Sequence, residues 1–156
     1  MFYIDFLEII KTLSYLGFFI SGLISSSTIF IPIPLYGMII FAEKLGINPI
    51  LAAISAALGS SIGELTSYFI GMGIKETVLK REGKKYKKWL EYFKRFGEFS
   101  ILLFAALPLP FDFIGILAGF LKYDIKKFVI FTFIGKLIKM LLIVYLGEIA
   151  LQYLGW

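Results

Sequence analysis

The stretch at residues 12–42 reads TLSYLGFFISGLISSSTIFIPIPLYGMIIFA and contains 31 residues without a charged side chain. One straight α-helix of this length would extend about 46 Å, whereas the hydrocarbon core of a bilayer is about 30 Å thick. Proline interrupts helices, and two prolines stand close together in Ile31-Pro32-Ile33-Pro34. We therefore expect a transmembrane helix at about residues 10–25, followed by a broken segment that enters the membrane and returns.

The composition of the whole chain also indicates a membrane environment. Of its 156 residues, 59% are hydrophobic and 17% are charged, whereas soluble domains contain about 45–50% apolar and about 25% charged residues. A globule of this size keeps much of its surface in water, so it could not bury the excess of apolar side chains. The chain is therefore expected to form a single all-α, polytopic membrane domain.

The chain contains no cysteine and no histidine. Disulfides, zinc sites built from these ligands, and catalysis by Ser-His or Cys-His pairs are therefore excluded. The remaining residues indicate no bond-breaking chemistry, so we expect neither an enzyme nor a bound cofactor or metal.

Further apolar runs follow the first one. Residues 45–74 and 128–147 each predict a transmembrane helix, because each is apolar over most of its length. Residues 99–121 contain Leu107-Pro108-Leu109-Pro110 and predict a second broken segment. The tips of the two re-entrant segments are expected at Pro32, Pro34, Pro108 and Pro110.

Residues 75–98 hold nine lysine or arginine residues and four glutamates, so this segment carries the entire net charge of +5. Aromatic and apolar residues recur in it at helical spacing, with lysines on the other side: Tyr86, Trp89, Leu90, Phe93 and Phe96. This pattern predicts an amphipathic helix on an anionic membrane surface. A nucleic-acid-binding surface is the other interpretation of a basic run, but the neighbouring membrane spans favour the first. The positive-inside rule places the segment in the cytoplasm. We expect the chain to be a multi-pass protein of the cell membrane.

The two halves of the chain match when the sequence is shifted by 76 residues. Residues 31–71 then align without gaps onto 107–147, with ten identities in 41 positions, including two prolines and two glycines. Each copy holds one broken segment and one crossing, so the second copy must run through the membrane in the opposite direction. We expect an inverted repeat of a re-entrant segment plus a transmembrane helix, at about residues 28–72 and 99–148, preceded by an N-terminal transmembrane helix.

Four ionisable side chains lie inside the apolar runs, namely Glu64, Asp112, Lys136 and Lys139. A charge at the bilayer centre costs about 2.5–3.5 kcal/mol on insertion scales, so these side chains must face one another, face water or be neutral. We expect them to line a polar groove for a transported substrate, together with Tyr68, which follows Glu64 by one helical turn. The unpaired backbone at the proline breaks also requires protein or a wet cavity around it.

Plainer structural roles for these residues stay open from the sequence alone. Lys136 and Lys139 share one helix face, and a pairing with Glu64 would fix two helices against each other. Asp112 would cap the helix that restarts after the second break. Tyr68 would anchor its helix at the membrane interface.

Several motifs occur in order over about residues 25–150: Ile31-Pro32-Ile33-Pro34, Gly59-x-x-x-Gly63-Glu64-x-x-x-Tyr68-x-x-Gly71, Leu107-Pro108-Leu109-Pro110-Phe111-Asp112, Gly119, Phe128 and Gly135. In their order and spacing the chain resembles the DedA family of membrane proteins, also called VTT or SNARE-associated proteins. The resemblance implies two re-entrant hairpins in an inverted repeat and the movement of lipids between leaflets. It also implies that Glu64 matches the acidic residue that precedes the family's tyrosine.

The chain departs from the family at both tips. Many members carry an acidic residue just after the first tip, where Leu35-Tyr36-Gly37 has none. Many bacterial members carry an arginine after the second tip, where Phe111-Asp112-Phe113 has none. The roles of those residues in head-group binding and proton coupling are therefore not transferred to this chain.

These observations predict a protein that moves phospholipids or polyprenyl-phosphate-type anionic lipids between leaflets, as a scramblase or an ion-coupled flippase. Its expected partners are membrane lipids with anionic head groups, not nucleic acids, and homo-oligomerisation is left open. Two alternatives are an ion-coupled transporter of small solutes or ions and a non-transporting membrane scaffold or assembly factor.

The predicted topology can be tested with single cysteines introduced into this cysteine-free chain. We expect impermeant thiol reagents to label residues 75–98 from the cytoplasmic side, and residues 43–49 and 150–156 from the outside. Labelling of both proline tips from the same side would contradict the inverted repeat.

Overall fold

The computed structural model describes residues 2–27, 35–78, 83–107 and 110–155. Within these ranges the regular structure is entirely helical, as the composition predicts. The elements are α1 (Phe2–Ser27), α2 (Leu35–Ile40), the short 3₁₀-helix η1 (Glu43–Leu45), α3 (Pro49–Gly63), α4 (Leu65–Val78), α5 (Gly83–Ala106), α6 (Asp112–Phe120) and α7 (Ile125–Tyr153).

Two of the described helical segments are long and apolar enough to cross a bilayer. The first is Pro49–Lys75, in which α3 and α4 follow each other across Glu64, and the second is α7. The predictions of an all-α fold with transmembrane helices near residues 45–74 and 128–147 are confirmed to this extent. The apolar part of α1 described here, Leu13–Ser27, has 15 residues and would extend about 22 Å.

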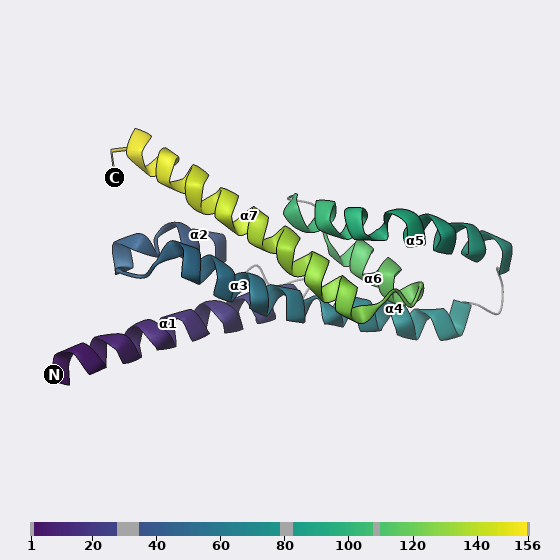
Figure 1. The fold of residues 1–156 in the computed structure, drawn as a ribbon, viewed down its shortest axis with the longest axis horizontal. Coiled ribbons are helices and arrows are strands. Elements are labelled where there is room, and N and C mark those ends of the chain that lie inside the picture. The colour runs from purple at the N-terminus through teal and green to yellow at the C-terminus, as the bar shows by residue number, and fades with distance from the viewer. Residues whose placement is uncertain (1, 28–34, 79–82, 108–109, 156) are drawn as a thin grey trace.

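The helices form two groups that share the long helices (Figure 1). α1 and α2 lie at the end of the molecule that also holds both chain termini, whereas α5 and α6 lie towards the other end. The long helices α3–α4 and α7 pass through both groups, run in opposite directions and cross near the middle. In the first group, which contains α1 and α2, α3 packs on α1 and α7 packs on α2. In the second group, which contains α5 and α6, α4 packs on α6 and α7 packs on α5.

Glycines let these helices approach closely. A Cβ atom on Gly59 would lie 1.9 Å from the carbonyl oxygen of Phe19, which brings α3 directly against α1. A Cβ atom on Gly119 would lie 1.8 Å from the carbonyl oxygen of Tyr68, which does the same for α6 and α4. Small residues at helix contacts are typical of membrane proteins, because close backbone approach strengthens packing where lipid offers no hydrophobic drive.

Each group encloses a buried apolar cluster. The first cluster joins α1, α2, α3 and α7: Phe18, Leu35, Ile39, Ala42, Ala52, Ala53, Ala56, Ala57 and Met140. The second joins α4, α5, α6 and α7: Tyr68, Phe93, Ile101, Ala105, Phe111, Ile114, Ala118, Leu121 and Phe128. The polar site described below lies between them.

The connections from α2 to α3 and from α6 to α7 share the same backbone conformation. Each contains one residue with a positive φ, Gly46 at 70° and Lys122 at 52°. Each ends in a side-chain cap, because Asn48 accepts from backbone N–H groups at the start of α3 and Asp124 does so at the start of α7. Both pairs of residues are separated by 76 positions, the shift that aligns the two halves of the sequence.

Contacts between the halves are also reciprocal under this shift. A Cβ atom on Gly71 would meet the carbonyl oxygen of Ile116, and a Cβ atom on Gly147 would meet the side chain of Ile40. The glycines are 76 residues apart, and so are the isoleucines. In one contact the glycine belongs to the first half and the isoleucine to the second half, and in the other contact this is reversed. A two-fold axis produces this pattern.

The breaks predicted at the prolines are described for the second half only. Pro32, Pro34 and Pro108 lie outside the described residues. Pro110 itself is not helical and lies between the end of α5 at Ala106 and the start of α6 at Asp112.

The basic segment is not a separate helix. α5 begins at Gly83 and continues to Ala106, so the basic and the following apolar residues form one helix. On its described part, Phe93 is buried and its ring packs against Tyr123, with 5.3 Å between the ring centroids. Phe96 is exposed. The side chains of Tyr86 and Trp89 are not among those that the structure describes.

Substitution of Gly59 tests the close packing of α1 on α3. We expect Gly59→Ala to lower the free energy of unfolding by about 1–3 kcal/mol, because the new methyl group overlaps backbone atoms that cannot move aside. Gly73→Ala is the matched control, since a Cβ atom there meets nothing within 4 Å. Thermal unfolding of both variants in detergent checks this, and equal stability of the two would contradict it.

Candidate functional site

Glu64 lies at the junction of α3 and α4 and is buried in the middle of the protein. It terminates α3, and its backbone carbonyl accepts from the N–H of Tyr68 as α4 begins. The preceding Gly63 brings α1 close, because a Cβ atom there would lie 2.5 Å from the carbonyl oxygen of Leu23. The carboxylate of Glu64 is therefore enclosed by α1 on one side and by the neighbouring helices on the others.

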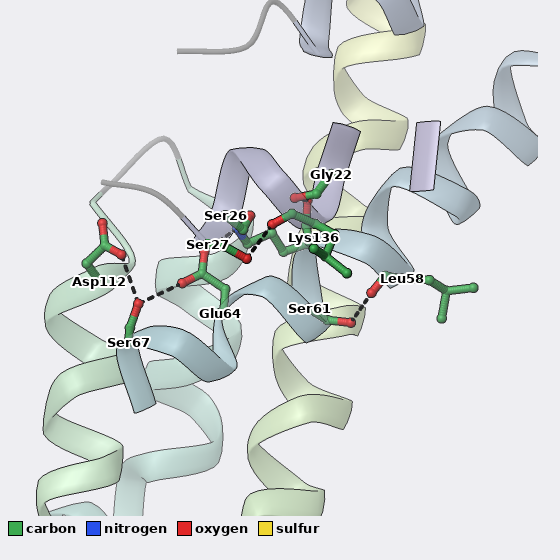
Figure 2. Close-up of polar contacts among 11 residues, drawn as sticks. Gly22, Ser26, Ser27, Leu58, Ser61, Glu64, Ser67, Asp112 and Lys136 are labelled. Carbon is green, nitrogen blue, oxygen red and sulfur yellow. Dashed lines mark hydrogen bonds and ion pairs between the residues drawn. The ribbon is translucent and has the colours of Figure 1, made fainter. Parts of the chain in front are cut away.

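Lys136 of α7 pairs with this carboxylate (Figure 2). Its Nζ atom lies 2.5 Å from Oε1 of Glu64, and the two side chains are only 8% and 5% exposed. The same Nζ donates to Oγ of Ser26 at 3.0 Å and lies 5.5 Å from the centroid of the Phe111 ring. The ammonium group thus contacts α1, the α3–α4 junction and the residue before α6.

Ser67 extends this network to the second half of the chain. Its hydroxyl donates to Oδ1 of Asp112 at 2.9 Å, and its oxygen lies 3.4 Å from Oε2 of Glu64 (Figure 2). A serine hydroxyl carries one proton and can therefore donate to only one carboxylate at a time. The shorter distance favours donation to Asp112, and Glu64 is compensated by Lys136.

Asp112 is the first residue of α6, and its carboxylate faces Ser67. The N-cap of α6 is Phe111, which makes no side-chain capping hydrogen bond. A role of Asp112 as a helix cap therefore does not explain why its carboxylate accepts a hydrogen bond from Ser67. Three of the predicted site residues, Glu64, Asp112 and Lys136, are brought together in one network.

The other two predicted site residues lie differently. The hydroxyl of Tyr68 donates to the carbonyl oxygen of Tyr123, and its ring packs against Phe128 with 5.1 Å between centroids. Tyr68 thus belongs to the second apolar cluster and makes none of these network contacts. Lys139 lies partly buried on α7, one helical turn beyond Lys136.

Three residues of the network were not predicted. Ser67 follows Glu64 by three positions, and that spacing places both on one face of a helix. Ser26 and Phe111 carry no comparable signal, because they reach Lys136 only through the tertiary packing of α1 and α6. Among the residues that the structure describes, no group of three or more His, Cys, Asp or Glu side chains gathers as a metal site would require.

Two long apolar helices, close glycine packing and an ion pair enclosed where the helices meet are features of a helical membrane protein with an internal ionisable site. The chain belongs to the VTT-domain family, because the model of that domain matches residues 24–149. The resemblance to the DedA family stated from the motifs is thereby confirmed.

Individual relatives agree over most of the chain. A protein of Methanocaldococcus jannaschii described as uncharacterized is 26% identical over 135 residues, which cover 85% of this chain and 83% of the relative. Two Lactococcus lactis proteins named alkaline phosphatase-like are 32% and 31% identical, over 89% of this chain and 73% of theirs. No solved structure matches the chain. The VTT family is not a known enzyme class.

The Glu64–Lys136 pair can be tested by a double-mutant cycle. We expect Lys136→Met to lower the free energy of unfolding by about 3–5 kcal/mol, because it leaves the Glu64 carboxylate buried without a counter-charge. The double variant Glu64→Gln/Lys136→Met should regain most of this loss. Chemical unfolding in detergent measures both values.

The exposed ion pair at the surface provides the control for this cycle. Lys127 pairs with Glu98 at 2.6 Å, with both side chains about half exposed. We expect Lys127→Met to leave the unfolding transition unchanged. If the double variant in the core is as unstable as the sum of its single variants, the two buried charges are not coupled.

Proposed function

We propose that this protein moves lipids with anionic head groups, phospholipids or polyprenyl-phosphate-type lipids, between the leaflets of the cell membrane. The VTT domain places the chain in a membrane family that is generally linked to transport or lipid handling. The observation that carries the finer proposal is the ion pair of Glu64 and Lys136, buried where helices from both halves of the chain meet.

The proposed architecture is an inverted repeat with two re-entrant hairpins. One hairpin is formed by α1 and α2 and the other by α5 and α6, while α3–α4 and α7 are the full crossings. This arrangement revises the expected N-terminal transmembrane helix, which becomes the first arm of a hairpin. It is supported by the matching connections before α3 and α7 and by the reciprocal contacts of Gly71 and Gly147.

An anionic head group would replace the Glu64 carboxylate as the partner of the Lys136 ammonium group. Phosphate oxygens accept from lysine as carboxylate oxygens do. When a phosphate occupies Lys136, Glu64 loses its counter-charge in a buried place, where an unpaired carboxylate takes up a proton. Lys139 adds a second cation one turn along α7. Binding of the head group and protonation of Glu64 are therefore coupled in this proposal.

The direction of net movement would follow from available gradients. The sequence contains no nucleotide-binding motif, so lipid moves downhill or is driven by an ion gradient coupled through Glu64 and Asp112. The basic residues 75–98 would face the cytoplasm, together with Lys122, Lys126 and Lys127, which lie between the end of α6 and the first turn of α7.

Two other functions fit parts of the site. A transporter of small solutes or ions would use the same charged residues, and a scaffold would need the ion pair only for stability. The Lactococcus relatives are named alkaline phosphatase-like. We nevertheless propose a non-enzymatic role, because the network lacks the histidines and cysteines of common metal-dependent hydrolases.

Reconstitution in vesicles tests the proposal. The vesicles contain phosphatidylglycerol with a fluorescent head group, and an impermeant quencher is added outside. We expect quenching beyond the outer-leaflet half for the wild type, and a rate lowered by about tenfold or more for Glu64→Gln or Lys136→Gln, equivalent to about 1.4 kcal/mol of barrier. An imposed proton gradient should change the wild-type rate and leave that of Glu64→Gln unaffected.

The surface ion pair supplies matched control variants. Glu98→Gln and Lys127→Gln remove the same charges from exposed positions and should keep the wild-type rate. Quenching that stops at half for several anionic lipids, with and without a proton gradient, would refute lipid translocation. Uptake of a soluble ion or solute under those conditions would instead support the transporter.

A further inference from the structure

A groove of about 520 Å³ opens between α1 and α2, away from the ion pair. Its floor includes Phe18, whose side chain is 4% exposed, and its rim includes the exposed side chains of Met38 and Phe41. The volume falls within the range of about 300–1,000 Å³ that is usual for ligand sites. Apart from Ser14 and Ser21, the lining residues are apolar, which suits a hydrocarbon chain.

Two glycines keep this groove open. Gly17 on α1 and Gly37 on α2 both line it, and a Cβ atom on either would meet nothing within 4 Å. The position of the second half that matches Gly37 is Phe113, so the repeated sequence itself carries a benzyl group there. Larger side chains at the two glycines would therefore occupy the groove without displacing other parts of the protein.

A cation lies at the mouth of the groove. Lys44 follows the rim residue Phe41 by one turn, and its Nζ atom lies 5.9 Å from the centroid of the Phe41 ring. It precedes Leu45, which also lines the groove. An apolar groove with an ammonium group beside its rim is complementary to a lipid that has an anionic head group.

We propose that this groove holds one hydrocarbon chain of an anionic lipid whose head group lies at Lys44. The inference deepens the proposed function and rests on it in one respect, namely that the bound lipid is the substrate before its head group enters the ion-pair site. α1 links the two places, because its Ser14, Gly17, Phe18 and Ser21 line the groove and its Ser26 contacts Lys136.

Photo-cross-linking tests where the chain lies. The probe is phosphatidylglycerol with a diazirine at the end of one acyl chain, in vesicles of phosphatidylcholine that contain the reconstituted protein. Because Phe18 is almost fully buried, an adduct on this residue reports a chain inside the groove, not lipid at the outer surface. We expect such adducts in the wild type and a decrease of about tenfold or more in Gly37→Phe, the factor that corresponds to about 1.4 kcal/mol.

Matched variants make the result specific. Gly73→Phe adds the same ring at another open glycine, on α4 outside the groove, and should keep the wild-type adducts. Gly17→Phe fills the groove from the opposite wall and should act as Gly37→Phe does. Lys44→Gln should reduce adducts with the phosphatidylglycerol probe and leave those with a phosphatidylcholine probe unchanged.

Translocation is measured on the same vesicles, so the two proposals fail separately. Absence of adducts on Phe18 in the wild type, or equal adducts in the wild type and Gly37→Phe, would overturn the groove as a lipid site even if lipid is translocated. Adducts that respond to Gly37→Phe and Lys44→Gln in a protein that translocates no lipid would support the groove and refute the proposed function.

Discussion

The ion pair of Lys136 and Glu64 joins helices that lie far apart in the sequence. Lys136 reaches from α7 to the junction of α3 and α4 and also contacts Ser26 of α1, while Ser67 carries the network on to Asp112 of α6. Each group compensates another, because a charge or polar atom left alone at this depth is costly. The ion pair therefore helps to fix α7 against the junction of α3 and α4.

The glycines make this polar centre geometrically attainable. Gly63 lets α1 approach until Ser26 lies beside Lys136, and Gly115 lets α6 approach until Asp112 lies beside Ser67, since a Cβ atom there would be 2.7 Å from Cβ of Ser67. Side chains as short as serine and aspartate can then bridge between helices. The two apolar clusters lie on either side of the network, so packing and polar contacts depend on each other.

Hydrophobic runs and the repeat predicted the two crossings and the all-helical fold, because length and apolarity suffice for that decision. A pairing of Glu64 with Lys136 or Lys139 was one interpretation that the sequence left open, and the structure forms it with Lys136. The continuous helix α5 was not predicted, since its basic and apolar parts look like different segments when charge alone is considered. Tyr68 shows the same limit, because its position one turn from Glu64 does not reveal that its hydroxyl is used by the backbone of Tyr123.

The exchanged contacts between the halves have a consequence for biosynthesis. The face of α4 that carries Gly71 is covered by α6, and α2 is covered by the end of α7. The first half therefore leaves the ribosome before the residues that cover it. During that interval the open faces of α2 and α4 must be shielded by lipid or by the insertion machinery, and the ion-pair partner of Glu64 arrives only with the last helix.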